Sequence, residues 1–564
     1  MKRVFITVLL LAFIIVANAQ GKLTAELMWK FGRVSDVQVS PDGKTILYGV
    51  TTYSLSKNMG KRNLCTIPTD GGTAVQITDA EGYVLNGIWR PDGKKISFLS
   101  TESGSMQVWE MNPDGTDKKQ ISNIEDGING FVYAPDMKHI LFIKDVKLDS
   151  TVNDLYPDLP KADAMLFDDL MYRHWNNWTD YAYSHVFFAA YDTLGKIGAA
   201  TDIMLNEKYD SPLTPDGGME QITWSPDGKL IAYTCRKLHG KDEALSTNSD
   251  IYIYDIETGK TENISEGMQG YDQDPAFSND GKKIVWSCMK TAGYESDKKR
   301  IMLYDFATKQ HTDLSENFDE SASNFRWDPL DDNTLYFISG INATYQLWSI
   351  NITTKKNIQI TDGIFDYTEM VTALSKPKKS KYFQTILVGA KMSMSMPAEI
   401  FKVEKVKKNF EETQITYTNK AILDTLKMGA VEKRWITTTD NKKMLVWVIY
   451  PPTFDSTKKY PALLYCQGGP QSAVSQFWSY RWNFQIMAAH DYIIVAPNRR
   501  GLPTFGQEWN DEIALDYGGQ NMKDYLTAID TVSTEPFIDK NSLGAVGASY
   551  GGFSVYWLAG NHNK

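Results

Sequence analysis

Five residues near the end of the sequence have the pattern that activates a serine for acyl transfer. Residues 547–551, GASYG, follow an apolar run at 543–546 and precede an apolar, helix-compatible segment. Strand, sharp turn and helix are the context in which a G-x-S-x-G serine stands clear of a sheet. The two glycines avoid the clashes that a Cβ atom would make with the neighbouring strand and helix. Ser549 is therefore the candidate nucleophile, although the pattern alone also fits a turn that only packs a helix on a sheet.

A glycine-rich loop upstream fits the second requirement of this chemistry. Acyl transfer needs N–H donors aimed at the negative oxygen that develops on the substrate carbonyl. In hydrolases with such a serine, one donor is the next residue, here Tyr550, and the other lies in the loop after an earlier strand. Residues 461–470, PALLYCQGGP, have the pattern of a buried strand that enters such a loop. Gly468 and Gly469 are therefore candidates for the second donor, unless they only make a tight turn.

The sequence offers Ser549 no acid and no base. Hydrolases of this kind place both after the nucleophile, in the order Ser, Asp or Glu, His. No Asp or Glu follows Ser549, and only one histidine, His562, does. At about 1.5 Å of rise per helical residue, His562 would lie up to roughly 20 Å from the serine. His490 precedes the nucleophile strand, so we expect a C-terminally truncated domain that is inactive as it stands.

The elements around these residues predict an α/β-hydrolase domain. From about residue 416 the pattern changes to strands that alternate with helical stretches, the layout that holds such a serine. The expected elements are a hairpin at 431–452, strands in 461–470 and 491–501, and helices at 476–490 and 517–533. The nucleophile strand would lie at an open edge of the sheet, since nothing follows to cover it.

A repeated turn fills the middle of the chain. Six segments begin with an apolar residue, make a Pro-Asp-Gly type of turn and continue as an alternating strand: 39–50, 89–100, 133–144, 224–235, 277–288 and 327–339. In such a turn Pro presets φ, Asp bonds its own backbone and Gly accepts a positive φ. A period near 50 residues with four short strands predicts a β-propeller of about seven blades, with six or eight open. A β-sandwich array would need linkers that the sequence does not show.

The third and fourth repeats are too far apart for one unit. Pro135 and Pro226 are separated by 91 residues, so one repeat has lost its turn or carries an insertion. We place an atypical stretch, residues 145–184, between blades three and four. Its central part, ADAMLFDDLMYRHWNNWTD, is dense in acids and aromatic rings that could bind a cation or a peptide end. An ordered loop over the propeller edge fits as well.

Composition narrows the classes of function. A formal net charge of −10 without a basic block argues against nucleic acid as a partner. Two cations, a 13-residue apolar run and a small-residue pattern predict a signal peptide cleaved after Ala19, and hence a periplasmic or secreted protein. The apolar run is too short to span a bilayer. Cys235 and Cys288 fall in equivalent strands of separate repeats, so we expect buried thiols rather than a disulfide.

The motifs together resemble a known enzyme family. The segments GASYGGF, CQGGP and APNRRGLPTFGQEW (496–509), with a propeller ahead of them, are similar to the prolyl oligopeptidase family of serine peptidases. Within it, the resemblance is to the group of bacterial dipeptidyl peptidases and acylaminoacyl peptidases. It implies that Ser549 is the nucleophile, that Tyr550 and Gly469 supply the oxyanion N–H groups, and that no cofactor is needed. Some relatives have a tyrosine where this sequence has Gln467, so backbone donors are favoured.

The resemblance also implies a substrate and a division of the chain. The propeller would restrict the buried site to short peptides, and release of dipeptides would require an anchor for the free N-terminal amine. Asp168 and Asp169 in the atypical stretch are the candidates. The expected segments are a signal peptide (1–19), an N-terminal segment packing on the hydrolase domain (20–36), the propeller (37–415) and the incomplete hydrolase domain (416–564).

Two other functions remain open at this point. A non-enzymatic propeller could bind a peptide beside a degenerate hydrolase domain, and an esterase would share the same chemistry. No C-x-x-C occurs and the closest histidines, His174 and His185, are 11 residues apart, which disfavours metal catalysis. The expected partner is a short peptide, without a membrane span, and a homodimer is compatible with the sequence.

Overall fold

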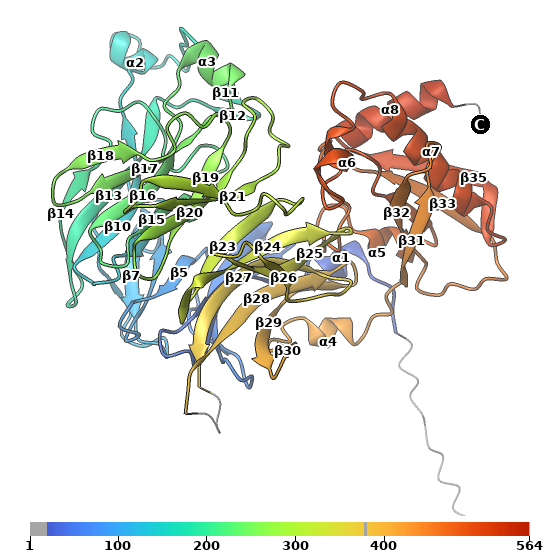
Figure 1. The fold of residues 1–564 in the computed structure, drawn as a ribbon, viewed down its shortest axis with the longest axis horizontal. Helices are drawn as coiled ribbons and strands as arrows, with labels where there is room; N and C mark the ends of the chain where they lie inside the picture. Colours follow the sequence, from blue (N-terminus) through green and yellow to red (C-terminus); the bar gives the residue numbers. More distant parts are fainter. Residues whose placement is uncertain (1–19, 377–380, 563–564) are drawn as a thin grey trace, which may run out of the picture.

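The computed structural model describes residues 20–376 and 381–562, so the predicted signal peptide at 1–19 lies outside the described residues. Figure 1 shows two parts, a set of small sheets coloured blue to yellow and a mixed sheet with helices coloured orange to red. In the part of the chain that the structure describes, no helix is long and apolar enough to cross a membrane.

Five four-stranded antiparallel sheets and one eight-stranded sheet form the first part, which confirms the predicted propeller. The eight-stranded sheet consists of two four-stranded blades that are joined by one parallel pair, Tyr345 with Asp366. The strands of blades one to three are β1 (Arg33–Val39), β2 (Thr45–Ser54), β3 (Met59–Pro68), β4 (Val75–Gln76); β5 (Leu85–Trp89), β6 (Ile96–Ser100), β7 (Gln107–Met111), β8 (Lys119–Gln120); β9 (Gly130–Tyr133), β10 (His139–Lys147), β13 (Ala182–Asp192) and β14 (Lys196–Asp202). Those of blades four and five are β15 (Ile222–Trp224), β16 (Leu230–Cys235), β17 (Asp250–Asp255), β18 (Lys260–Asn263); β19 (Asp272–Phe277), β20 (Lys283–Cys288), β21 (Arg300–Asp305) and β22 (Gln310–Asp313). Those of blades six and seven are β23 (Ala322–Asp328), β24 (Asp331–Ile341), β25 (Thr344–Asn351), β26 (Asn357–Gln359); β27 (Asp366–Ser375), β28 (Gln384–Ser393), β29 (Met396–Val406) and β30 (Asn409–Gln414).

The repeated turns join the first two strands of a blade as the sequence predicts. In blade one the Ser40 hydroxyl donates to Asp42 at 2.6 Å and accepts the N–H of Thr45 at 3.0 Å. Gly43 has φ +74°, a conformation that costs an ordinary residue energy but not glycine. Blade three has Met137 at the equivalent position, and this residue adopts φ +59° without being glycine. The turn geometry therefore holds even where one of its preferred residues is missing.

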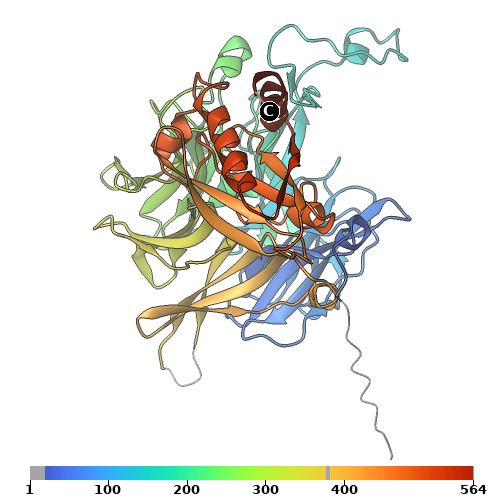
Figure 2. The ribbon, with the colours of Figure 1, turned by 90° about the vertical axis from the view of Figure 1, so that its right-hand side faces the viewer.

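The atypical stretch lies inside blade three, not between blades three and four. Strands β10 and β13 pair directly, from His139 with Ala190 to Lys147 with Ala182, so residues 148–181 are a long excursion from one hairpin. The excursion carries α2 (Val152–Leu155) and the short strands β11 (Arg173–His174) and β12 (Asn177–Trp178). It stands out from the propeller in both views (Figures 1 and 2). The 91-residue spacing is thus an insertion, and no repeat is lost.

The second part is a five-stranded sheet in the order β31-β32-β34-β33-β35. Its strands are β31 (Val431–Thr437), β32 (Lys443–Ile449), β33 (Tyr460–Cys466), β34 (Ile493–Pro497) and β35 (Ile538–Gly547). The first pair is the predicted hairpin, and β33 runs parallel to both β34 and β35. Among the described strands β35, which leads into the serine, has a neighbour on one side only, as expected.

Helices cover this sheet, with one departure from prediction. They are α5 (Phe484–Ala489), α6 (Gln507–Asp511), α7 (Gln520–Ser533) and α8 (Tyr550–Asn561). The helix expected at 476–490 is confined to α5, because the aromatic residues before it pack elsewhere: the Trp478 ring lies 5.5 Å from that of Phe31. His490 caps the C-terminus of α5 and is exposed, in agreement with a capping or surface role.

The N-terminal segment and several loops join the two parts. Lys22 forms an ion pair with Asp491 at 2.7 Å, and Gly21 pairs with Leu426 after α4 (Lys420–Leu423). The remaining described helices are α1 (Ala25–Met28), α3 (Gly240–Leu245) and a 3-10 turn at Met219–Gln221. The described cysteines are free and buried, as expected for Cys235 and Cys288.

Candidate active site

Ser549 occupies a strained turn between β35 and α8. It is the N-cap of α8 and has φ +56° and ψ −126°, a conformation that a residue with a Cβ atom rarely adopts. Strain of this kind persists only where the surrounding structure enforces it, and it is concentrated at functional sites. The residue is exposed, and its hydroxyl makes no hydrogen bond with any residue in the described ranges. The geometry is that of a presented nucleophile.

The glycines of the motif make this turn possible. A Cβ atom on Gly551 would lie 2.1 Å from the Cys466 carbonyl oxygen, and one on Gly547 would lie 2.7 Å from the same atom. Contacts below about 3 Å do not occur for real Cβ atoms, so β33 can approach the turn only because both positions are glycine. The G-x-S-x-G spacing therefore has the predicted steric cause, a clash that a Cβ atom on either glycine would make with the neighbouring strand.

The glycine loop after β33 lies against the nucleophile turn. A Cβ atom on Gly468 would be 2.9 Å from the Ala548 carbonyl oxygen and 3.6 Å from the Ser549 Cβ. Gly469 has φ +122°, which only glycine adopts readily. The structure thus places the Gly468-Gly469 loop against the turn at Ser549, and Tyr550 follows the serine at the start of α8.

Gln467 belongs to the framework of this loop. Its N–H donates to the Tyr525 hydroxyl at 3.0 Å, and its side-chain amide donates to the Ser472 hydroxyl at 3.3 Å. The side chain is buried, so its amide serves the loop itself. This arrangement fits the expectation that backbone groups supply the oxyanion contacts.

The one histidine after Ser549 lies at the far end of α8. His562 is the C-cap of that helix, and a helix of this length separates it from the serine by roughly 20 Å at 1.5 Å per residue. It therefore cannot accept the Ser549 proton.

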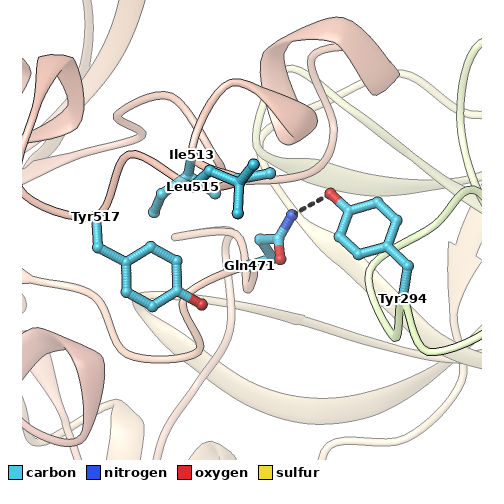
Figure 3. A pocket seen from close by; sticks show the side chains of 6 residues that line it. Tyr294, Gln471, Ile513, Leu515 and Tyr517 are labelled. Carbon is cyan, nitrogen blue, oxygen red and sulfur yellow. Dashed lines mark hydrogen bonds between the residues drawn. The ribbon is translucent and has the colours of Figure 1, made fainter. Parts of the chain in front are cut away.

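A cavity of about 470 Å³ adjoins the glycine loop at the junction of the two parts (Figure 3). It is lined by Tyr294 of the propeller and by Gln471, Ile513, Ala514, Leu515 and Tyr517. The Gln471 amide donates to the Tyr294 hydroxyl at 2.9 Å, and that hydroxyl donates to Asp511 at 2.7 Å. The Tyr550 hydroxyl donates to the Tyr517 carbonyl at 2.8 Å, so the cavity touches both segments that carry oxyanion donors.

The two proposed amine-binding acids are exposed on the insertion. Asp168 and Asp169 precede β11, and Asp169 lies beside the start of α3, since a Cβ atom on Gly240 would be 2.4 Å from its Oδ2. On α3, Glu243 lies 3.9 Å from Arg236, and burial raises the pKa of its carboxyl. No local pattern singles out Glu243, because the insertion that lies beside α3 is remote from it along the chain.

Known proteins are similar to this chain over nearly its whole length. The profile of the prolyl oligopeptidase family matches residues 478–564. Dipeptidyl-peptidase 5 of Porphyromonas gingivalis is 48% identical over 547 residues, which cover 97% of this chain and 78% of that protein. Dipeptidyl-peptidase 5 of Porphyromonas endodontalis is 42% identical, with coverages of 97% and 77%.

Solved structures agree on the fold. Acylaminoacyl peptidase of Pyrococcus horikoshii superposes with a TM-score of 0.75 at 18% identity, covering 96% of this chain and 77% of that one. Dipeptidyl peptidase 4 of Porphyromonas gingivalis superposes with a TM-score of 0.51 at 15% identity, covering 93% and 72%. Because the family model matches the nucleophile region and a relative is 48% identical over 97% of the chain, the chain belongs to the prolyl oligopeptidase family.

Proposed function

We propose that this protein is a serine peptidase that releases dipeptides from the N-terminus of short oligopeptides. The observation that carries the proposal is the strained, exposed Ser549, which lies against Gly468 of the glycine loop and is followed by Tyr550. Its likeness to the dipeptidyl-peptidase 5 proteins supports the dipeptide product. An esterase would use the same groups, so the assay below separates the two.

The reaction follows from the positions of these groups. The Ser549 oxygen attacks the carbonyl carbon of the second peptide bond while its proton passes to a base. The Gly469 and Tyr550 N–H groups stabilise the negative oxygen of the tetrahedral intermediate. The C–N bond then breaks, the leaving amine takes the proton, and the dipeptide stays as an ester on Ser549. Water hydrolyses this ester in the same way and frees the serine.

The base is a group other than His562, which lies too far from Ser549 to accept its proton. Without a base the Ser549 hydroxyl stays protonated and is a weak nucleophile, so turnover depends on that group.

Asp168 and Asp169 are proposed to hold the substrate's free amine. A carboxylate near the α-ammonium group would place the second peptide bond, and no other, at Ser549. The propeller would admit only short peptides. The predicted signal peptide at 1–19 would direct the protein to the periplasm or the medium. The assignment of Asp168 and Asp169 rests on the position of the insertion and on the exposure of both acids.

One assay tests the proposed function. A dipeptidyl amide with a free amine, its N-acetylated form and a simple acyl ester are offered to the wild-type protein and to Ser549→Ala. We expect release of intact dipeptide from the free amide alone, seen by mass spectrometry, and none with Ser549→Ala. Equal hydrolysis of the acetylated amide, or hydrolysis of the ester alone, would contradict the dipeptidyl-peptidase proposal.

A further inference from the structure

Arg499 is a buried cation without an acid. Its side chain is fully buried just after β34, and no carboxylate of the described residues forms an ion pair with it. The next residue, Arg500, pairs with Asp440, Glu512 and Asp524. Burying a charge without a counter-charge costs free energy. The buried charge of Arg499 therefore requires an explanation, whereas the charge of Arg500 is balanced by its ion pairs.

The Arg499 guanidinium donates to groups that hold the glycine loop. Its Nη2 donates to the Pro470 carbonyl at 2.9 Å, and its Nε donates to the Tyr525 hydroxyl at 3.2 Å. The same hydroxyl accepts the N–H of Gln467 at 3.0 Å. The loop is therefore fixed on both sides of Gly468 and Gly469.

The same cation contacts the residue that carries the other oxyanion donor. The guanidinium carbon lies 4.8 Å from the centre of the Tyr550 ring and 5.6 Å from that of Tyr525. A cation over an aromatic face is attracted to it, more strongly where water is excluded. The Tyr550 hydroxyl is itself anchored on the Tyr517 carbonyl and the Asn521 amide oxygen, both at 2.8 Å. Arg499 thus touches both segments that carry the candidate oxyanion donors.

We propose that Arg499 is a positioning residue of the oxyanion hole. It fixes the separation between the Gly469 and Tyr550 N–H groups, and its positive charge favours the negative tetrahedral intermediate. Its partners are neutral carbonyls, a hydroxyl and aromatic rings, and no carboxylate of the described residues pairs with it. In a region from which water is excluded, such a fixed charge acts over a longer range than it would in water. The inference rests on the proposed function and deepens it.

The test compares three variants of the full-length protein. Arg499→Met removes the charge and the donors, Arg499→Lys keeps the charge but loses the planar fork, and Tyr525→Phe removes only the hydroxyl. We expect Arg499→Met to lower kcat by about 100-fold with KM changed by less than about threefold, as for loss of one oxyanion donor. Arg499→Lys and Tyr525→Phe should lie between this variant and the wild type.

Inhibitor binding separates positioning from a general loss of structure. A peptide boronate forms a tetrahedral adduct on serine, whereas the dipeptide product does not, so only the boronate should lose affinity in Arg499→Met, in proportion to kcat. Arg90→Met is the matched control, since Arg90 is also buried and donates to a tyrosine hydroxyl and a carbonyl, but within the propeller. It should lower thermal stability while leaving the affinity ratio of boronate to dipeptide unchanged.

Hydrogen exchange gives a reading that does not depend on catalysis. Amides of residues 467–472 should exchange faster in Arg499→Met and Tyr525→Phe than in the wild type or Arg90→Met. Unchanged exchange together with unchanged kcat and boronate affinity in folded Arg499→Met would overturn the inference. An equal loss of dipeptide and boronate affinity would do the same. Failure of the proposed function is distinct, because the wild-type protein itself would then release no dipeptide.

Discussion

The Cys466 carbonyl oxygen determines which residues the nucleophile turn can contain. A Cβ atom on Gly547 or on Gly551 would clash with this oxygen, so both positions must be glycine. Between them Ser549 takes a left-handed φ that is unfavourable for a serine by itself. The Ser549 hydroxyl therefore reaches its exposed position because the glycine on each side, Gly547 and Gly551, has no side chain.

This steric argument predicts opposite effects for two glycines of the same helix. Gly551→Ala should destabilise the hydrolase domain by about 1–3 kcal/mol, because the new methyl group overlaps the Cys466 backbone. Gly560→Ala is the control: apart from its chain neighbours and its own helix backbone, no atom of the described residues lies within 4 Å of its Cβ position, so it should stabilise α8 by up to about 1 kcal/mol. Thermal unfolding of both proteins measures the difference. Equal stabilities would show that the turn can relax around a methyl group.

The insertion in blade three illustrates what a repeat pattern can and cannot reveal at the level of elements. The turn signature placed the blades correctly, because it depends on local preferences of Ser, Pro, Asp and Gly. It could not show that β10 and β13 pair across the insertion, since strand pairing depends on residues far apart in sequence. The excess length was visible in the sequence, but its place within a hairpin was not.

Removal of the insertion should leave the propeller intact. The N–H of Leu148 donates to the Tyr181 carbonyl, so Asn-Gly in place of residues 149–180 would close the hairpin in a two-residue turn. We expect a folded protein whose Ser549 still reacts with an acylating inhibitor but which no longer prefers a free N-terminal amine. Comparing hydrolysis of free and acetylated dipeptidyl amides measures this preference. If the preference survives, Asp168 and Asp169 do not hold the amine.

In other elements too, local sequence patterns predict some features, whereas tertiary contacts determine the rest. The strand, serine turn and helix at 538–561 follow from a short motif and were predicted from sequence. The helix at 484–489 is shorter than its amphipathic pattern predicted, since Trp478 packs on the N-terminal segment instead of extending it. Tyr294 and Arg499 are near the glycine loop only in the folded chain, so their contacts could not be read from any local pattern.

At the scale of the molecule, the two parts meet through buried acids of the propeller. Glu320 accepts the N–H of Gly506 at 2.8 Å, and Asp366 accepts the Ser475 hydroxyl at 2.6 Å. Burial raises the pKa of each carboxyl to about 7. The interface is therefore built from groups that take up a proton near neutral pH.

This protonation predicts how stability changes with pH. The folded protein holds a proton on Glu320 between its unfolded pKa near 4.5 and about 7, so stability should fall as pH rises through this window and level off above it. One such group contributes at most about 3 kcal/mol. Glu320→Gln should show a smaller decrease in melting temperature between pH 5 and pH 8 than the wild type. An identical pH profile in the two proteins would mean that Glu320 does not titrate in this range.

Covalent labelling tests directly whether Ser549 is the nucleophile of this molecule. The full-length protein is treated with a fluorophosphonate, digested, and mapped by mass spectrometry. We expect a single phosphonyl adduct on Ser549, which disappears in Ser549→Ala while the variant stays folded. An adduct on another residue, or undiminished labelling of Ser549→Ala, would contradict it.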